Sequence, residues 1–293
     1  MPSKILNGVV RRSDDDRDYK FEKHIAHLVK TVDVPDEFDL STSVNEPPIA
    51  DQGQKGACGA FSGAGALGYI NNGAVLSPEF IYDQTRSLMG TLNEDSGVDN
   101  RTLASVLVKY GTCLEKQYPY TEKLITVAPS DKLVKYAQEY KALKYVFVDG
   151  IDQIMQTMVT LNTPVIFGME VFSGFESDEA KNTGLIPMPS KTESGLGGHD
   201  QEIMGWNKNL DFGNGLIGGV KVRNSWGKNY FQSGYEWIPF AYFDSSLNYV
   251  FDSFVVMKND TTVVSPTTTK RSNGFLSLIF AFLKSLFSIW GEY

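Results

Sequence analysis

The spacing of apolar residues changes along the chain, and the change divides it into two halves. In the first half, apolar residues recur at intervals of three and four, which predicts helices over residues 78–88 and 101–110. A stretch rich in small residues, 60–70, follows a glycine-rich loop and predicts a tightly packed buried helix. Residues 130–140 predict one more helix, so the first half is expected to be mostly helical.

The second half has a different texture. Short runs rich in β-branched and aromatic residues are separated by Gly, Asn, Asp and Ser, a pattern typical of strands. These runs cover residues 143–148, 165–172, 199–206, 218–223, 235–238 and 254–257. A helical half followed by an all-β half predicts an α+β protein of two lobes with a cleft between them, a usual place for a site.

The beginning of the chain differs from this body, which we place at residues 36–258. Residues 1–35 form a highly charged N-terminal arm, with acidic and basic side chains crowded between Asp14 and Lys20. Such a run is typical of a solvated arm, and the alternative is a clamp that lies over the folded body.

The end of the chain differs as well. Residues 259–273 are rich in Thr, Ser and Pro and predict a linker. Residues 274–293 are strongly apolar, with polar positions at about helical period, which predicts an amphipathic C-terminal helix. At ~1.5 Å per residue, residues 275–290 span roughly 24 Å, which is short of a ~30 Å hydrocarbon core. We therefore expect a helix at a membrane surface rather than a span, or a helix docked on the body or on a second subunit.

Composition narrows the function classes. The chain of 293 residues carries a net charge of -8, which offers no basic surface for a nucleic-acid partner. Its two cysteines, Cys58 and Cys113, are too few for a disulfide framework or a thiolate metal cluster, so a reducing compartment, no metal and no cofactor are expected. The start lacks an apolar stretch of signal-peptide length, which favours an intracellular or virion-associated protein that is not secreted.

Cys58 has the setting of a reactive thiol. It lies where the glycine-rich loop meets the predicted helix 60–70, between Gly56 and Gly59. The positive end of a helix dipole lowers a thiol pKa, and the glycines would let a substrate backbone approach. The alternative is a buried structural cysteine.

His199 is one of three histidines and begins a predicted strand. A lone histidine is usually structural or merely exposed. A functional role for His199 is favoured because Asn224 lies about two dozen residues downstream, where its amide could fix the tautomer of the imidazole ring. Trp226 could then cover the hydrogen bond and keep water from it.

Three segments together resemble the papain-like cysteine peptidase family. Gln52-Gly-Gln-Lys-Gly-Ala-Cys58-Gly-Ala-Phe-Ser is similar to its nucleophile segment, Gly-Gly-His199 to its histidine segment, and Val-Arg-Asn224-Ser-Trp-Gly to its asparagine segment. Order and spacing agree, and the likeness runs over residues 35–258. The resemblance implies a papain-like two-lobe fold, with a helical left lobe, a β-barrel-like right lobe and the active site in the cleft between them.

The resemblance also implies roles. Cys58 would be the nucleophile, His199 its proton partner, and Asn224 the residue that orients the histidine. Gln52 and the backbone N–H of Cys58 would donate to the oxyanion of a tetrahedral intermediate, where losing one donor typically costs ~2.7 to 4 kcal/mol.

Candidates for substrate binding follow from the same comparison. Asp95-Ser96-Gly97 occupies the place of the family's stretch that pairs with the substrate backbone, with Gly97 its best representative, and Gly198 and Trp226 flank the catalytic residues. Asp200 would face the main specificity pocket and favour a basic side chain, or else merely pair with a neighbouring Lys or Arg.

The chain departs from the family pattern at several positions, among them Tyr230-Phe231, where the family usually has Trp-Gly. Lys55 stands where the family commonly has a disulfide-forming cysteine, and Gly59 stands where a bulky Trp usually follows the nucleophile. The strand after the histidine is normally apolar but here carries Asp200 and Glu202. These carboxylates would favour an imidazolium–thiolate pair, and they would be costly if buried unpaired.

The chemistry predicted from these residues is thiol-dependent hydrolysis of a peptide or protein substrate by a cysteine endopeptidase, through a covalent acyl-enzyme. Acyl transfer to an amine is one alternative. A catalytically silent peptide-binding or structural protein that keeps the fold is another. The family's long inhibitory pro-segment has no counterpart, so we expect residues 1–35 to act as a short pro-segment or to have no such role.

Overall fold

The computed structural model describes residues 6, 8–11 and 32–258. The predicted linker (259–273) and the predicted C-terminal helix (274–293) lie outside the described residues, as does most of the arm. Within the described part, none of the helices combines the length and the apolar character needed to cross a membrane.

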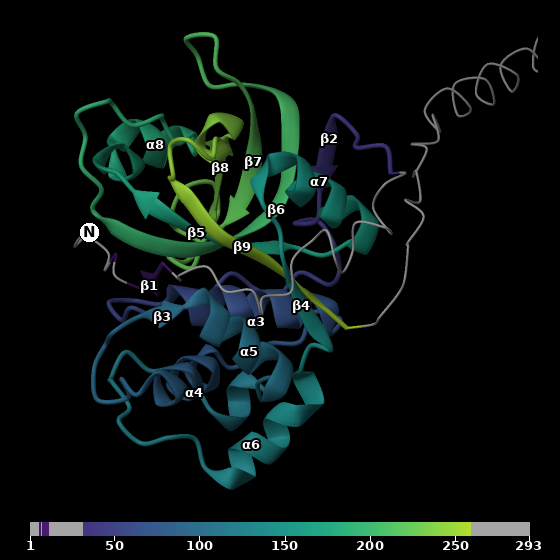
Figure 1. Ribbon diagram of the computed structural model, residues 1–293, viewed down its shortest axis with the longest axis vertical. Coiled ribbons are helices and arrows are strands. Elements are labelled where there is room, and N and C mark those ends of the chain that lie inside the picture. Colours follow the sequence, from purple (N-terminus) through teal and green to yellow (C-terminus); the bar gives the residue numbers. More distant parts are fainter. Residues whose placement is uncertain (1–5, 7, 12–31, 259–293) are drawn as a thin grey trace, which may run out of the picture.

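Four α-helices build the first lobe, in the lower half of Figure 1. They are α3 (Cys58–Ile70), α4 (Pro78–Met89), α5 (Asn100–Lys109) and α6 (Asp131–Ala137). Local signals set their ends. The Ser77 side chain accepts from the backbone N–H of Phe80 at the start of α4, and Gly90, in the left-handed region at φ 76°, ends that helix. The predicted helices are confirmed, with shifts of a few residues at their ends.

The second lobe is built on a seven-stranded sheet. The strands run in the order β4-β9-β5-β6-β7-β8, and β2 also pairs with β6. Their bounds are β2 (Glu37–Asp39), β4 (Lys144–Phe147), β5 (Val165–Val171), β6 (Gly197–Asp211), β7 (Ile217–Arg223), β8 (Tyr235–Pro239) and β9 (Val250–Met257). All pairings in this sheet are antiparallel. The α+β two-lobe prediction is confirmed, but the sheet is open rather than closed into a barrel, because β4 and β8 end it on opposite sides.

The second half is not all-β, which corrects the prediction from sequence. It also contains α7 (Gly150–Leu161) and α8 (Asp178–Thr183). Helix α7 buries Ile154, Met155 and Met158 against the sheet lobe, and ends at Asn162 in the left-handed region at φ 50°. Its apolar spacing of three and four is helical, but its β-branched residues lower helix propensity and obscure that signal.

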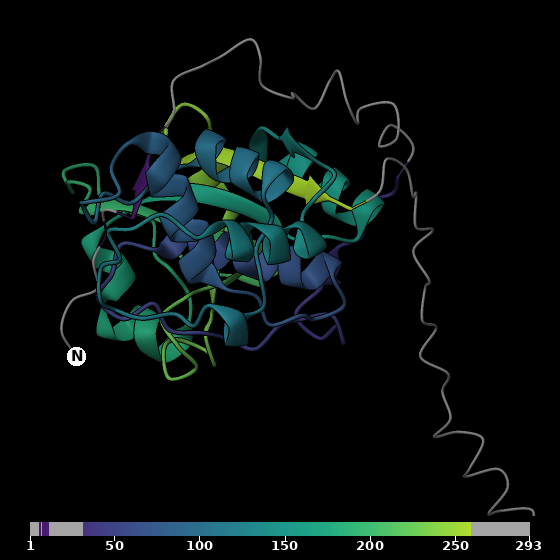
Figure 2. The same ribbon diagram turned by 90° about the horizontal axis from the view of Figure 1, so that it is seen from below.

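Helix α3 lies between the two lobes and is buried over almost its whole length. It packs against α4 and α5 on one side and against β6 on the other, and seen from below the helices lie in front of the sheet (Figure 2). Gly65 makes the close approach to β6 possible, since a Cβ there would lie 2.2 Å from the Glu202 carboxylate. The predicted tightly packed small-residue helix is confirmed, and it carries Cys58 at its first position.

Candidate active site

Cys58 begins α3 and is fully buried. Its Sγ accepts a hydrogen bond of 3.3 Å from the backbone N–H of Asp200, the residue after His199. Two residues before it, the N–H of Gly56 donates to the carboxylate of Asp95 at 3.1 and 3.2 Å. The nucleophile candidate is therefore tied to the sheet lobe directly and to the helical lobe through the loop that precedes it.

Lys55 fixes the same loop by charge. Its buried ammonium bonds both oxygens of Glu79 on α4, at 2.6 and 2.8 Å, and the carbonyl of Thr121 at 2.8 Å. The rings of Tyr120 and Tyr82 lie 4.7 and 5.4 Å from it. An ion pair thus anchors the loop at the position where the resemblance leads one to expect a cysteine.

His199 and Asn224 meet on the sheet. His199 lies on β6, and Asn224 follows the last residue of β7, whose Arg223 pairs with Glu202. His199 Nε2 and Asn224 Oδ1 are 3.1 Å apart and both residues are buried. The indole of Trp226 stacks on the imidazole with ring centroids 4.6 Å apart and 25° between the planes. The three residues come together as the sequence predicts.

Gln52 is also fully buried and links two loops of the site. Its Nε2 donates to the carbonyl of Lys55 at 2.9 Å, and its Oε1 accepts from the hydroxyl of Ser225 at 2.5 Å. Its backbone N–H donates to the carbonyl of Ser225 at 2.8 Å. The side-chain amide of Gln52 is thus held beside the loop that precedes Cys58, and its N–H group donates to that loop.

Residues 6 and 8–11 lie across the site, and we call them the cover segment. Strand β1 (Val9–Val10) pairs in parallel with β3 (Val98–Asp99), so that both are seen at the boundary between the lobes in Figure 1. A Cβ added at Gly8 would lie 2.3 Å from Cys58 Sγ, so the glycine packs directly on the sulfur.

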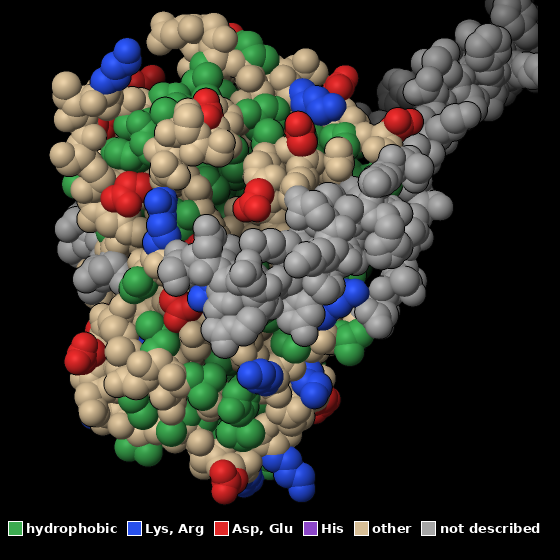
Figure 3. Space-filling model, in the orientation of Figure 1, with side chains coloured by type: hydrophobic (Ala, Val, Ile, Leu, Met, Phe, Trp, Pro, Cys, Tyr) green, Lys and Arg blue, Asp and Glu red, His purple; other side chains and the backbone are tan. Residues whose placement is uncertain are grey.

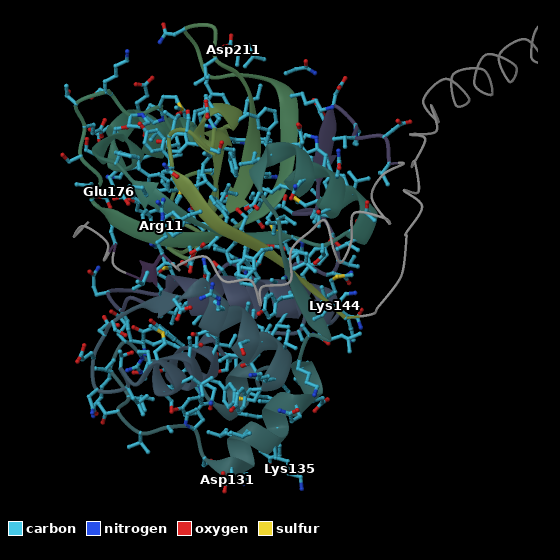
Figure 4. The ribbon with its side chains drawn as sticks, viewed as in Figure 1. Arg11, Asp131, Lys135, Lys144, Glu176 and Asp211 are labelled. Atoms are coloured by element: carbon cyan, nitrogen blue, oxygen red, sulfur yellow. The ribbon has the colours of Figure 1, made fainter. Side chains whose placement is uncertain are left out.

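The end of the cover segment is held on the sheet lobe. Arg11, at the boundary between the lobes in Figure 4, donates to the carbonyl of Asn248 at 2.6 Å and lies 4.5 Å over the ring of Phe251.

On the face shown in Figure 3, basic and acidic side chains of the described residues are interspersed over both lobes.

Next to the predicted backbone-pairing residues, Ser96 and Gly97, it is the following residue that bonds the cover segment. The N–H of Gly97 points to the hydroxyl of Tyr82 at 3.3 Å, and the Ser96 hydroxyl bonds Thr91. It is Val98 whose N–H donates outward, to the carbonyl of Gly8 at 3.0 Å. Gly198 faces the same cover segment, since a Cβ there would lie 2.6 Å from Val9.

Asp200 explains the glycine at position 59. The carboxyl group is fully buried and accepts a bond of 2.9 Å from the amide of Asn100. A Cβ at Gly59 would lie 2.5 Å from Asp200 Oδ2 and 2.6 Å from Val98. Burial raises the pKa of Asp200 well above its usual range. Gly59 and Asp200, two departures from the family pattern, are therefore linked, because the Asp200 carboxyl group occupies the space that a side chain at position 59 would need.

The pKa of the Cys58 thiol shifts in the direction opposite to the predicted one. Burial and the Asp200 carboxyl raise its pKa above the ordinary value, whereas the helix N-terminus was expected to lower it. The cover segment excludes water from the sulfur, and desolvation disfavours the thiolate. With the cover in place, the thiol form is favoured.

The remaining buried acids lie behind the catalytic residues. Glu202 pairs with Arg223 at 3.1 Å, and Arg223 also reaches Glu46 at 3.2 Å. Burial raises the pKa of Glu202 to about 8 against this partner. Glu236 on β8 accepts from the amide of Asn224 at 3.1 Å. Both carboxyl groups lie inside the protein.

Three residues of the site were not predicted from the sequence: Gly8, Val98 and Glu236. The first has a signal, because Gly8-Val9-Val10 is a short β-prone run inside an otherwise charged arm. Glu236 has a signal too, because alternation along the predicted strand 235–238 puts it on the same face as Ile238. Among the described residues, no group of three or more His, Cys, Asp or Glu side chains could hold a metal ion.

Comparisons with known proteins agree with one another. A family model described as papain family cysteine protease matches residues 34–242. An uncharacterised peptidase C1-like protein of Acanthamoeba polyphaga mimivirus is 30% identical over 223 residues, which are 70% of this chain and 69% of that protein. A probable cysteine protease of Arabidopsis thaliana is 27% identical over 71% of this chain but only 44% of its own length.

Solved structures give the same result. Xylellain, a cysteine protease from Xylella fastidiosa, superposes with a TM-score of 0.74 at 26% identity and covers 87% of this chain and 97% of its own. A procathepsin B of Trypanosoma congolense superposes with a TM-score of 0.67 at 15% identity, over 87% of each chain, which is a likeness of fold alone.

Proposed function

The chain belongs to the papain family of cysteine proteases, and from that premise we propose that Cys58, His199 and Asn224 carry out its peptide hydrolysis. It is a cysteine endopeptidase that acts on peptide or protein substrates. One observation carries the assignment of residues. The buried His199–Asn224 bond lies under Trp226, and the residue after His199 holds the sulfur of Cys58.

The chemistry assigns one task to each group. Cys58 passes its thiol proton to His199 and the thiolate attacks the peptide carbonyl carbon; a C–S bond forms, and the carbonyl oxygen becomes an oxyanion. His199 gives this proton to the leaving amine as the C–N bond breaks. It then takes a proton from the water that attacks the thioester, and the C–S bond breaks to release the acid and restore Cys58. Asn224 holds the imidazole through Nε2, and the amide of Gln52 exchanges its bond to Lys55 for one to the oxyanion.

Active-site labelling tests this assignment, and the second buried thiol supplies the matched control. An epoxysuccinyl inhibitor should label the wild type and Cys113→Ala at Cys58 and leave Cys58→Ala unlabelled. Hydrolysis by Cys58→Ala should fall by at least about 10⁴-fold. Hydrolysis that survives in Cys58→Ala would refute the assignment. A folded protein that hydrolyses nothing and takes no label once the cover segment is removed would favour the catalytically silent alternative, and amide formation with an added amine would favour acyl transfer.

We propose in addition that the cover segment inhibits the enzyme, as a short pro-segment would. The pairing of β1 with β3 occupies the strand edge that an extended substrate would need, and Gly8 occupies the approach to the sulfur. Inhibition is therefore steric, and it also keeps the thiol protonated. Displacement of the cover segment should therefore remove the steric block and allow the Cys58 thiol to ionise at the same time.

A one-carbon change tests the cover. Gly8→Ala places a Cβ against the sulfur and should raise the rate of inhibitor labelling about tenfold, which corresponds to about 1.4 kcal/mol lost from the covered state. Val10→Ala is the control, since that side chain points outward and is about half exposed. Equal labelling rates in the wild type, Gly8→Ala and a variant lacking residues 1–11 would exclude inhibition by this segment.

Asp200 supports a proposal on specificity. Its Oδ2 has no hydrogen-bond partner among the described residues, and it lies beside Gly59 and near Val98, which pairs with Val9 of the cover segment. We propose that a basic substrate side chain reaches this oxygen once the cover has left. Peptide-library profiling should show a basic preference that Asp200→Ala removes, and a purely aliphatic preference in the wild type would contradict the proposal.

Localisation remains a proposal from the sequence pattern. The mimivirus relative agrees with an intracellular or virion-associated protein. Residues 275–290 are apolar enough to bind a membrane surface. A variant ending at Lys258 should then lose sedimentation with liposomes, and unchanged sedimentation would refute membrane binding through this segment.

A further inference from the structure

Behind the His199–Asn224 pair lies a small buried polar cluster made of Gln201, Asn224 and Glu236. Residues 199, 201 and 203 share one face of β6, because side chains alternate along a strand. The register places Ile203 opposite Val222 and Val222 opposite Glu236, so Glu236 lies on the same face of the sheet. The three side chains are 1%, 3% and 0% exposed, in that order.

The bonds in this cluster converge on a single oxygen. Glu236 Oε1 accepts from Asn224 Nδ2 at 3.1 Å and also from Gln201 Nε2. Two atoms are left over. Glu236 Oε2 and Gln201 Oε1 are buried and have no hydrogen-bond partner among the described residues. Both are oxygens, so a bond between them requires a proton on one of them.

The neutral acid satisfies both atoms at once. With a proton on Oε2, Glu236 donates to Gln201 Oε1 while its Oε1 accepts from Gln201 Nε2, which closes a cyclic acid–amide pair. The ionised form would leave both oxygens as acceptors and bury a charge that no cation balances. Arg223, a cation nearby, is engaged by Glu202, Glu46 and the carbonyls of Pro47 and Pro48.

The titratable groups around the cluster do not supply a counter-charge either. On β6 the group concerned is His199, which Asn224 separates from Glu236. From the loop after β7, Tyr230 faces Glu236, and burial raises the pKa of its hydroxyl, so this group brings no positive charge. Burial raises the pKa of Glu236 well above its ordinary value, in agreement with the bonding pattern.

We propose that Glu236, held as a neutral acid by Gln201, is a positioning residue that fixes the orientation of the Asn224 amide. An amide has two nearly equivalent orientations, so something must select the one that presents Oδ1 to His199. In the reversed orientation, Asn224 Oδ1 would oppose Glu236 Oε1 and its Nδ2 would oppose the N–H of Ser225, which now donates to Oδ1 at 2.7 Å. The inference rests on the proposed catalytic role of His199 and Asn224.

The test compares an isosteric neutral side chain with an apolar one. In Glu236→Gln, the new amide can accept from Asn224 and donate to Gln201, so kcat should stay within about threefold of the wild type with both limbs of the pH profile of kcat/KM unchanged. In Glu236→Leu, Asn224 loses its acceptor, and kcat should fall about tenfold or more at an unchanged KM. Ile238→Ala, on the same face of β8, controls for loss of packing and should change stability without changing the pH profile.

Each outcome bears on the proposal. If Glu236→Gln shifts a limb of the pH profile, or loses as much kcat as Glu236→Leu, Glu236 acts as an anion and the proposal is wrong. Should Glu236→Leu fail to fold, Glu236→Gln alone still decides between the neutral acid and the anion. In an Asn224→Ala background, Glu236→Leu should cause no further loss of kcat, whereas a purely structural role would give additive losses. Failure of the catalytic assignment itself is separate, because it would show as hydrolysis by Cys58→Ala.

Discussion

The two lobes support the active site with buried polar groups of different kinds. In the helical lobe, the loop before Cys58 is fixed by an ion pair, Lys55–Glu79, whose donors and acceptors all have partners. In the sheet lobe, the strands behind His199 carry Asp200 and Glu236, which are buried without a cation. The helical lobe uses matched charge at this loop, whereas the sheet lobe, besides its Glu202–Arg223 pair, buries acids whose pKa values burial raises.

The difference indicates what each support can tolerate. A buried ion pair is stable at any pH at which both partners are charged, but it fails when one partner is removed. A neutral acid makes a directional donor and acceptor without a counter-charge, but it is lost when pH rises enough to ionise it. The nucleophile side should therefore be sensitive to substitution, and the histidine side should be sensitive to pH.

The largest expected effect breaks the charged support. Lys55→Met leaves Glu79 buried without its cation and should lower the free energy of unfolding by about 3–5 kcal/mol. Urea denaturation measures it. The double variant Lys55→Met/Glu79→Leu is the control and should recover most of the loss, because no unpaired charge remains. A single variant as stable as the wild type would show that the pair is not a support.

The next effect concerns pH and the sheet lobe. The pKa of Glu202 rises from 4.5 to about 8 on folding, and those of Asp200 and Glu236 rise well above their usual range. In the helical lobe, Asp83 adds a rise to about 6. A raised acid pKa means that the folded state holds protons that the unfolded chain has released, so stability falls as pH rises from about 4.5 to about 8.

Thermal unfolding at pH 5, 6, 7 and 8 measures this dependence. The midpoint should drop by roughly 4 °C or more over the range, equivalent to about 1–2 kcal/mol. Glu236→Gln should drop less than the wild type, because it cannot ionise. A midpoint that rises from pH 5 to pH 8 would show that these acids are ionised in the folded protein.

An effect of similar size tests where the two lobes touch. Gly59→Ala places a Cβ against both Asp200 and Val98 and should destabilise the protein by about 1–3 kcal/mol. Asp200→Ala in the same chain should relieve part of that loss, because the space of the carboxyl group becomes available. Additive losses in a double-mutant cycle would mean that the two positions do not compete for space.

The smallest effect is an ion pair on the exposed part of the sheet lobe. Lys221 lies 2.9 Å from Asp39, and their side chains are 19% and 39% exposed. Lys221→Met should change the free energy of unfolding by only about 0–1 kcal/mol, because solvent screens the pair. A loss as large as that of Lys55→Met would remove the contrast between buried and exposed pairs.

Features that short continuous segments of the sequence encode were predictable. The helices of the first lobe follow from apolar spacing and capping residues, and the segments around Cys58, His199 and Asn224 each carry several family-like residues in a row. The mutual placement of His199, Asn224 and Trp226 agrees with that prediction. In each case the signal lies within about ten residues.

Features that depend on distant pairings were not predictable. The sheet stays open because β4 and β8 do not meet, which no local pattern encodes. The pairing of Val9 with Val98 joins segments about ninety residues apart, and its register of one residue decides that Val98 rather than Gly97 faces the cover segment. The protonation of Glu236 depends on its burial and on its contact with Gln201. In the sequence alone, an acidic residue within a predicted strand only interrupts the apolar pattern.

The contact between Gly59 and Asp200 has a consequence for the history of the site. Any side chain at position 59 would overlap the Asp200 carboxyl group, while an acid at position 200 would have no room beside a bulky neighbour of the nucleophile. An ancestor with a large residue at position 59 would therefore have had to lose it before, or together with, the arrival of the acid. The order of the two substitutions is constrained by volume, and returning to the large residue now requires giving up the acid first.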